Sequence, residues 1–351
     1  MKTLERNTKG ERVQNREAMP PGKKKRKIHP LFTVLFCMGL IAMGGALWLR
    51  FAVKPPAENP LLNDPSLRIG GQQPGGGARP VPGTVKENFY TFVLAGLDPE
   101  GYNTDVLMVA AFDADKGQLH VVNIPRDTQV TGANGKVRKI NASWTLGAEE
   151  QLKGDLQKII GFAPSNTMLV NIKGFVRLVN AVDGVDFDVP QDMNHRDPIV
   201  ERQIHLEKGP QHLTGEKALQ LVRFRGYNGG VPDYQRIQMT QDFLKAVAKK
   251  TLTPGSLFKL PEFIGIANEN VKTALTATEM MWFAQRMMKL DSENIHFHTL
   301  EGDPSYYYKR QNYVLLDEKT VLDVVNKTVN PFTKDITKDN LALSRTYDEK
   351  R

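Results

Sequence analysis

The feature that most constrains this chain is a run of nineteen uncharged residues near its N-terminus, from Leu31 to Leu49. At about 1.5 Å per residue, a helix of that length spans about 28 Å, close to the ~30 Å hydrocarbon core of a bilayer. The basic stretch Lys23–Lys27 precedes the run, and basic flanks stay on the cytoplasmic side of a membrane. The sequence therefore predicts a transmembrane anchor at residues 31–49, a basic cytoplasmic tail at residues 1–30, and a main domain outside the membrane.

Two other interpretations explain this run less well. A cleaved signal peptide usually has an apolar region of about 7–15 residues followed by a small-x-small cleavage site, whereas this run is longer and ends in Leu47-Trp48-Leu49 before Arg50. A buried core helix fits poorly, because the run is apolar on every side and is flanked by charge.

The positive charge of the chain is concentrated in the predicted tail. The whole chain has 47 Lys and Arg against 39 Asp and Glu, a formal charge of +8. The first thirty residues hold ten basic and three acidic residues, or +7, so the other 321 residues carry only +1. A nearly neutral body argues against a nucleic-acid-binding surface. The single cysteine, Cys37, excludes a disulfide framework.

The rest of the chain divides into a linker, a folded domain and a tail. Residues 54–88 contain seven Pro and six Gly, a composition typical of an extended linker. Folding signals begin at Phe89, where three apolar runs ending near Ile124 predict three strands. The domain is expected to extend over residues 89–329, and residues 330–351 are expected to be a polar C-terminal tail.

Helical and strand patterns alternate through the predicted domain. This predicts an α/β fold, a three-layer α/β/α extracytoplasmic domain behind the single N-terminal transmembrane helix. Two further strands are predicted at residues 167–172 and 295–300. The predicted helices cover Ala148–Ile160, Phe175–Val182, Thr214 to about Val222, Asp233 to about Lys249, Thr278–Leu290 and Lys319–Asn326.

Two carboxylates bracket the loop between the first two predicted strands. Asp98 follows the first strand and Asp105 begins the second. Carboxylates at neighbouring strand ends can share Mg²⁺, which usually binds one or two carboxylates together with phosphate oxygens of a substrate. The alternative is an ordinary turn rich in Asp and Asn.

An arginine marks the end of the third predicted strand, in the segment Ile124-Pro125-Arg126-Asp127-Thr128. Because proline cannot donate to the strand ladder, we expect Arg126 to lie at the strand tip, beside the first loop. The alternative is a surface ion pair between Arg126 and Asp127, which would contribute little to stability.

A second basic cluster contains Arg223, Arg225 and Arg236. Arg223 and Arg225 face the same side only in extended chain, so they converge only if the helix ends before them. Arg236 is expected in the first turn of the next helix, where free backbone N–H groups also favour anions. Guanidinium groups match phosphate oxygens in a bidentate way, so the cluster predicts a phosphate site; the alternative is a solvated basic loop.

Other chemistry-bearing patterns are weaker. His296 and His298 would face one side of a strand, but without a third ligand they are expected to have a structural role. The sequence has no G-x-S-x-G, P-loop or H-E-x-x-H motif.

Six motifs occur in a fixed order between residues 89 and 248. They are GLD…TD at 96–105, IPRDT at 124–128, KIN at 139–141, GVDFDVP at 184–190, G-x-x-x-L-T-G-E-x-A-L-x-x-V-R-F-R at 209–225 and D-x-x-R at 233–236. This ordered set resembles the LytR–CpsA–Psr family of cell-envelope proteins. A basic tail, a single anchor and an extracytoplasmic domain at the bacterial cell membrane fit that family as well.

The resemblance implies a magnesium-dependent phosphotransferase. Members of the family take a glycopolymer from a polyprenyl-pyrophosphate carrier and join it through a phosphodiester to peptidoglycan. The resemblance implies that Asp98 and Asp105 hold magnesium, that Arg126 is catalytic, and that Asp105 and Asp233 are the candidates for a general base. The residues implied in pyrophosphate binding are Arg126, Lys139, Asn141, Arg223, Arg225 and Arg236.

Three positions depart from the family pattern. The family commonly has Arg where this chain has Asn103, and Arg-Gln where it has Met239 and Thr240. Lost charged hydrogen bonds would weaken pyrophosphate binding by ~1–3 kcal/mol each. The alternative function is therefore a non-catalytic module that binds polyprenyl-linked envelope intermediates on the same scaffold. A transcriptional regulator, a label that the family also carries, would need a basic DNA-reading surface in the cytoplasm, which the neutral body does not offer.

Overall fold

The computed structural model describes residues 83–98, 101–132, 134–196, 203–224 and 233–350. Within these ranges, none of the helices has the length and apolar character needed to cross a membrane. The predicted tail, the predicted anchor at residues 31–49 and nearly all of the predicted linker lie outside the described residues. What is described is a mixed α/β unit, as predicted.

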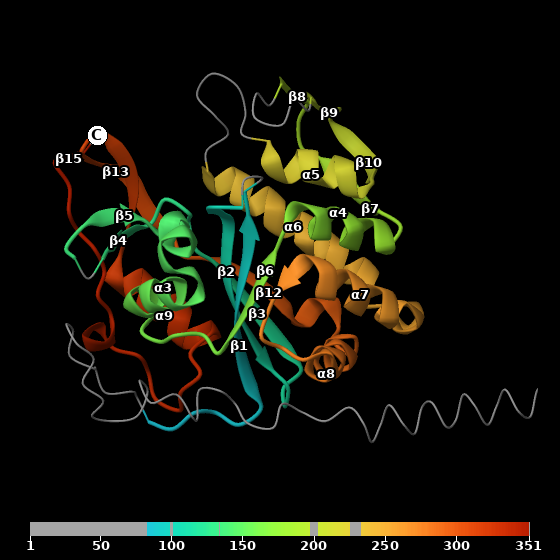
Figure 1. Cartoon of the computed structure of the whole chain (residues 1–351), viewed down its shortest axis with the longest axis horizontal. Coiled ribbons are helices and arrows are strands. Elements are labelled where there is room, and N and C mark those ends of the chain that lie inside the picture. The colour runs from blue at the N-terminus through green and yellow to red at the C-terminus, as the bar shows by residue number, and fades with distance from the viewer. Residues whose placement is uncertain (1–82, 99–100, 133, 197–202, 225–232, 351) are drawn as a thin grey trace, which may run out of the picture. The chain divides into compact units, whose positions relative to one another are not determined.

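In the described part of the chain, a six-stranded sheet with the order β11-β6-β1-β2-β3-β12 forms the centre (Figure 1). The strands are β1 (Phe89–Leu97), β2 (Thr104–Asp113), β3 (Gln118–Asn123), β6 (Asn166–Val170), β11 (Val271–Lys272) and β12 (Ile295–Thr299). β1, β2 and β3 form antiparallel pairs, β6 runs parallel to β1, and β12 runs parallel to β3. The first three predicted strands and the two later ones are all confirmed.

Helices cover both faces of this sheet (Figure 1). On one face α3 (Ser143–Ile160) and α9 (Glu318–Thr328) bury Leu156 and Val325 against Val109 of β2. On the other face α8 (Ala277–Met287) packs Phe283 against Phe92 of β1, with ring centroids 5.0 Å apart. Alternate residues of β1 and β2 contribute to the two cores, because successive side chains of a strand point to opposite faces.

A third core lies among the helices and hairpins that follow β6. α4 (Ile172–Ala181), α5 (Gly215–Arg223) and α6 (Asp233–Thr251) bury apolar side chains such as Leu221 and Phe243 against β7 (Val185–Val189). The other elements here are β8 (Met193–Arg196), β9 (Gln203–Leu206), β10 (Gly209–Leu213), α7 (Leu260–Asn270) and the short 3-10 helices Pro254–Lys259 and Ser292–Asn294.

The predicted helices are present, and α4, α5, α8 and α9 begin at a side-chain cap. Thr214 caps α5 by accepting a hydrogen bond from the backbone N–H of Lys217. Thr276 and Glu279 form a capping box, so α8 begins at Ala277, one residue before the predicted start at Thr278. α3 starts earlier than predicted, at Ser143, and bends at Gly147 and Ala148, whose backbone angles are not helical.

The prediction of a polar tail at residues 330–351 is wrong. Phe332, Ile336 and Leu341 are buried in the same core as α3 and α9, and Ser344 donates a hydrogen bond to the side chain of buried Gln129. β15 (Glu349–Lys350) pairs with β13 (Gly302–Tyr308), which also pairs with β14 (Gln311–Leu316); the 3-10 helix Lys338–Asn340 precedes β15. The apolar residues of this segment follow neither a helical nor a strand period, and so they give no sequence signal.

The first described residues are fixed to this same C-terminal segment. Val85 forms a β-bridge with Phe332. The backbone N–H of Lys86 donates to the carbonyl of Pro331 over 2.8 Å, and that of Thr333 donates to the carbonyl of Thr84 over 2.9 Å. The chain is therefore held in place before β1 begins.

Candidate functional site

Asp98 closes the loop that joins β1 to β2. Its Oδ1 accepts a hydrogen bond from the backbone N–H of Tyr102 over 2.8 Å. Its Oδ2 accepts from the backbone N–H and from the side-chain amide of Asn103, over 3.1 and 3.0 Å. The turn that the sequence left as an alternative is thus formed, and Asn103 is a direct partner of Asp98.

Asp105, at the start of β2, holds the arginine that follows β3. Arg126 Nη1 lies 2.8 Å from Asp105 Oδ1, and their side chains are 20% and 30% exposed. The alternative of a surface pair between Arg126 and Asp127 is therefore wrong. Arg126 Nε is buried and has no hydrogen-bond partner among the described residues. The ion pair thus orients the guanidinium while donors are left for another group.

Arg236, which α6 supplies, meets this pair at one small pocket. The described lining of the pocket includes Asp105, Arg126, Arg236 and Thr240, from three separate segments. Arg236 is buried, with 8% of its surface exposed. The pocket holds about 10 Å³, roughly the room that one water molecule needs. The structure thus brings together three of the predicted site residues.

The two departures on α6 have different consequences. Thr240 lies one helical turn beyond Arg236, donates its hydroxyl to the carbonyl of Arg236 over 2.8 Å, and lines the pocket. Met239 is buried in the core that contains Phe243, four residues on. Residues four apart share a helix face, so position 239 faces the core and the methionine removes no charge from the described pocket.

The segment Lys139–Asn141 is hydrogen-bonded to the backbone of Arg126 and to Thr104, the neighbour of Asp105. It joins β5 (Val137–Lys139), which pairs with β4 (Gln129–Thr131), to a 3-10 turn at Ile140–Ala142. The backbone N–H of Asn141 donates to the carbonyl of Arg126 over 3.2 Å, and its carbonyl accepts from the Thr104 hydroxyl over 3.5 Å. These contacts fix the backbone on both sides of the ion pair.

Lys139 itself is paired elsewhere. Its Nζ lies 3.0 Å from Asp127 Oδ1 and 6.0 Å from the centre of the Tyr313 ring. It is not part of the described pocket lining. The structure therefore supports a positioning role for this segment more directly than a contact of Lys139 with an anion in the pocket.

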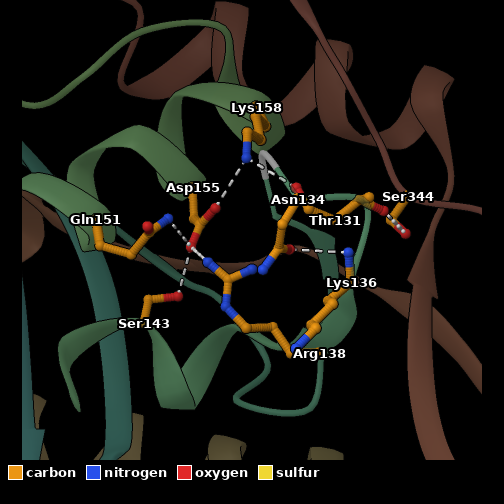
Figure 2. A network of polar contacts seen from close by, with 9 residues as sticks. All are labelled: Thr131, Asn134, Lys136, Arg138, Ser143, Gln151, Asp155, Lys158 and Ser344. Carbon is orange, nitrogen blue, oxygen red and sulfur yellow. Dashed lines mark hydrogen bonds and ion pairs between the residues drawn. The ribbon is translucent and has the colours of Figure 1, made fainter. Parts of the chain in front are cut away.

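A buried carboxylate anchors the same segment on its other side (Figure 2). Arg138, next to Lys139 on β5, contacts Asp155 of α3 through Nη2. Asp155 is fully buried and also accepts from Ser143 over 2.7 Å, from Gln151 over 3.0 Å and from Lys158 over 3.1 Å. We call Arg138, Ser143, Gln151, Asp155 and Lys158 the Asp155 network. It fastens β5 and the following turn to α3, and so it supports the backbone behind Arg126.

The remaining predicted residues are only partly described. Arg223 is half-buried and is the last residue of α5, so the helix does not end before it, contrary to the condition set for its convergence with Arg225. The described pocket lining does not include Arg223. Arg225 lies outside the described residues, as does the side chain of Asp233, the first residue of α6.

Sequence reasoning missed one polar residue of the pocket, Asn123. It is the last residue of β3, is only 6% exposed, and lines the pocket beside Arg126. The available signal was an amide that directly follows the apolar residues Val121 and Val122 at the end of β3, because a buried amide needs hydrogen-bond partners.

The described carboxylates and histidines do not form a complete metal cage. Within the described ranges, no three His, Cys, Asp or Glu side chains are grouped so that they could hold a metal ion. A cation at Asp98 and Asp105 would therefore take its other ligands from water or substrate, which is the usual behaviour of Mg²⁺.

Comparison with known proteins gives one family over most of the chain. The LytR_cpsA_psr family model matches residues 77–330, more than half of the sequence. The polyisoprenyl-teichoic acid–peptidoglycan teichoic acid transferase TagV of Bacillus subtilis (strain 168) is 27% identical over 230 residues, covering 64% of this chain and 59% of TagV. TagU of Bacillus cereus (strain ATCC 14579), a transferase of the same description, is 27% identical over 308 residues, or 86% of this chain and 97% of TagU. The chain thus spans less than two thirds of TagV and nearly all of TagU.

Solved structures share the fold. The crystal structure of B. subtilis TagV aligns with a TM-score of 0.60 and 25% identity, over 69% of this chain and 96% of that one. A structure of TagT bound to LIIa-WTA aligns with a TM-score of 0.58 and 20% identity, over 74% of this chain and 92% of that one.

Proposed function

Because this chain belongs to the LytR–CpsA–Psr family, we propose that it is a phosphotransferase of cell-wall assembly. In this proposal it moves a glycopolymer from a polyprenyl-pyrophosphate carrier to peptidoglycan. The observation that carries the proposal is the meeting of Asp105, Arg126 and Arg236 at one pocket. The relatives described as teichoic acid transferases make a teichoic acid the first glycopolymer to test.

The proposed transfer forms one P–O bond and breaks another. A hydroxyl oxygen of peptidoglycan attacks the phosphorus that bears the glycopolymer, and the bond from that phosphorus to the bridging oxygen breaks. The carrier leaves as polyprenyl phosphate, and the hydroxyl proton passes to a base, for which Asp105 and Asp233 are the candidates. Charge on the phosphoryl oxygens and on the leaving phosphate is what the protein must stabilise.

Arg126 and Arg236 are suited to that task. Asp105 holds Arg126 through one nitrogen, and Arg126 Nε has no partner among the described residues. A guanidinium that is already oriented loses less entropy when it binds phosphate oxygens. We assign Arg223 and Arg225 to the same pyrophosphate, and Lys139 and Asn141 to the support or contact of that site.

We propose Mg²⁺ as the cofactor, held by Asp98 and Asp105. Their carboxylate oxygens are hard donors, and both residues lie at the base of one loop, where the backbone N–H of Asp98 donates to the carbonyl of Asn103 over 2.9 Å. When bound, the ion would neutralise charge on the pyrophosphate oxygens. Mg²⁺ is expected to raise the unfolding temperature of the protein, and Asp98→Asn is expected to abolish that rise.

We further propose that Leu31–Leu49 anchors the protein in the bacterial cell membrane, with the described unit outside. The carrier lipid is confined to that membrane, so an anchor keeps the enzyme near its donor. The linker at residues 54–88 would let the unit reach peptidoglycan. Protease added to intact cells stripped of their wall is expected to digest the described unit and to spare residues 1–30.

One alternative has an observation of its own. The pocket has room for about one water molecule, and Thr240 stands where the family commonly has a longer amide. A protein with this pocket could bind a carrier-linked intermediate without transferring it.

The deciding experiment uses the full chain in detergent with Mg²⁺, a polyprenyl-pyrophosphate-linked saccharide and peptidoglycan fragments. Mass spectrometry follows the joined product and the released polyprenyl phosphate. Arg126→Ala is the test variant. Arg177→Ala is the matched control, because Arg177 forms an exposed ion pair with Glu269 away from the pocket.

Product is expected with the unchanged protein and with Arg177→Ala, and a loss of about 100-fold or more is expected with Arg126→Ala. Donor binding without product would overturn the transferase in favour of the binding module. Absence of both binding and product would overturn both functions.

A further inference from the structure

Three histidines meet on one face of the sheet, on the neighbouring strands β3 and β12. His120 of β3 is the register partner of His296 of β12, and His298 lies two residues further along β12. The ring centroids of His296 and His298 lie 4.9 and 5.6 Å from that of His120, with 26° and 30° between the ring planes. The sequence pointed to His296 and His298 only, and the parallel pairing of β3 with β12 adds a third imidazole.

Two of the ring nitrogens already have the spacing of metal ligands. His120 Nδ1 and His298 Nε2 are 3.3 Å apart. Two nitrogens bound to tetrahedral Zn²⁺ at about 2.0 Å are separated by about 3.3 Å. In the hydrogen bond between the rings only one of these nitrogens carries the proton, so one ring must change tautomer before both can bind a metal ion. That change leaves both rings neutral and releases no proton.

Metal ions bind the neutral imidazole, so the site requires both rings to be neutral and to hold matched tautomers.

The charges around the rings do not oppose a cation strongly. Near His120, Asp113 and Lys116 form an ion pair with each other over 3.1 Å, so their charges largely cancel. Lys245, which acts on His298, places its Nζ 5.7 Å from the centre of the Phe297 ring. Since successive side chains alternate along a strand, Phe297 faces the other side of the sheet from His298. The ammonium group of Lys245 is therefore near a ring on the opposite face from the proposed ligands.

We propose that His120 and His298 form a binding site for a divalent cation of the Zn²⁺ type, with water in the remaining positions. No third protein ligand is placed for it among the described residues, and His296 stacks beside the pair without completing it. Imidazole ligands suit Zn²⁺, whereas the carboxylates at Asp98 and Asp105 suit Mg²⁺. The two sites therefore take different ions.

A metal ion here would join the edge strand to its neighbour and so act on α6. Gln241 of α6 is buried, and its side-chain amide donates to the carbonyl of His298 and to the hydroxyl of Thr299, over 3.0 Å each. α6 also carries Arg236, which lines the pocket. Fastening β12 to β3 thus stabilises the strand to which the arginine-bearing helix is attached.

The test titrates Zn²⁺ into the full chain, purified in detergent and without a histidine tag. Calorimetry measures the affinity, and thermal unfolding measures stabilisation by the ion. His120→Gln and His298→Gln are the test variants, and His205→Gln is the control, because His205 is exposed and bonded to Asn194.

We expect one saturable ion per chain, a raised unfolding temperature, and an affinity loss of about tenfold or more in each test variant. His205→Gln should bind like the unchanged protein, and His296→Gln should lose less than either test variant. Unchanged affinity in both test variants, an equal loss in His296→Gln, or no saturable binding up to about 1 mM Zn²⁺ would overturn the proposal.

A measurement on the unchanged protein keeps the proposal testable if a variant fails to fold. Co²⁺ in the site is expected to give the visible absorption of a nitrogen-ligated, low-symmetry ion, and Zn²⁺ should displace it. Addition of Mg²⁺ should leave the spectrum unchanged. A spectrum identical to that of hydrated Co²⁺ would overturn the proposal.

Discussion

Two arginine–aspartate pairs, twelve residues apart at their arginines, show how differently the same charges can be used. Arg126 contacts Asp105 at the pocket, where their side chains are 20% and 30% exposed. Arg138 contacts Asp155 on the far side of the same segment, where Asp155 has no exposure. One pair faces a place where a ligand can enter, and the other lies between a hairpin and a helix.

The burial of each carboxylate separates the two pairs, since Asp105 is 30% exposed and Asp155 is fully buried. Asp155 accepts hydrogen bonds from the four other members of its network (Figure 2), and a carboxylate has about four lone-pair sites. Arg126 and Arg138 each keep at least one buried nitrogen without a partner among the described residues, but only Asp105 and Arg126 are both partly exposed and line the pocket. We conclude that the Asp155 pair is structural, because its carboxylate is fully buried and fully bonded, whereas the Asp105 pair lines a pocket that a ligand can reach.

The largest effect on stability is expected from the removal of the Asp155 carboxylate. Asp155→Ala would leave the Arg138 charge buried and uncompensated, so we expect a loss of about 3–5 kcal/mol in the free energy of unfolding. Asp105→Ala, at a partly exposed pair, should cost about 1 kcal/mol or less. Urea unfolding of both variants measures the difference. A smaller loss for Asp155→Ala than for Asp105→Ala would contradict our interpretation.

The next largest effect is expected at the pocket and on rate. Arg126→Ala should lower turnover by about 100- to 1000-fold, or about 3–4 kcal/mol in the barrier, with an unfolding free energy within about 1 kcal/mol of the unchanged protein. Arg138→Ala should show the reverse, with lost stability as its main defect. Turnover and the free energy of unfolding are measured for both variants. Equal losses of both quantities in the two variants would show that the two ion pairs have the same role.

The pH dependence of stability is expected to come from His120 and from neither ion pair. Burial lowers the pKa of His120 from 6.5 to about 4. Between those values the unfolded chain binds a proton that the folded protein does not, so stability falls as the pH drops from about 6.5 towards 4. His120→Gln should flatten this part of the stability curve, and Asp105→Asn should not. Unfolding at a series of pH values measures it, and an identical slope in His120→Gln would assign the acid loss elsewhere.

The smallest effect is expected at Lys139, which lies between the two pairs. Its ion pair with Asp127 is about one quarter exposed, so Lys139→Met should change the unfolding free energy by about 1 kcal/mol or less. If Lys139 only positions the segment, turnover should fall by about tenfold or less. A loss as large as that of Arg126→Ala, measured in the same assay, would show that Lys139 leaves Asp127 to bind the pyrophosphate.

Part of this site was predictable because it depends on strand ends. Asp105 begins one strand and Arg126 follows the next, with Pro125 marking where the ladder stops. Neighbouring antiparallel strands bring such ends together whatever the rest of the fold does. The meeting of Arg236 with this pair needed the position of α6, which the sequence suggested only through the resemblance.

The Asp155 network was not predictable, because its sequence looks solvated. Asp155 follows Glu149, Glu150, Gln151 and Lys153 on a helix, and such a charged stretch usually faces water. Its burial depends on a hairpin that packs over it. The pairing of His120 with His298 was not predictable for a related reason, since two strands that are distant in the sequence bring these residues together.

The attachment of residues 84–86 to residues 331–333 has a mechanical consequence. A pull on the chain before residue 83 first meets the hydrogen bonds of Thr84 and Lys86 with the C-terminal segment, and only afterwards β1. The force is thus shared between the two ends of the folded unit, and the central sheet with its pocket is not the first part to yield. A force applied to the N-terminal side of the described unit can in this way be resisted without unfolding the pocket.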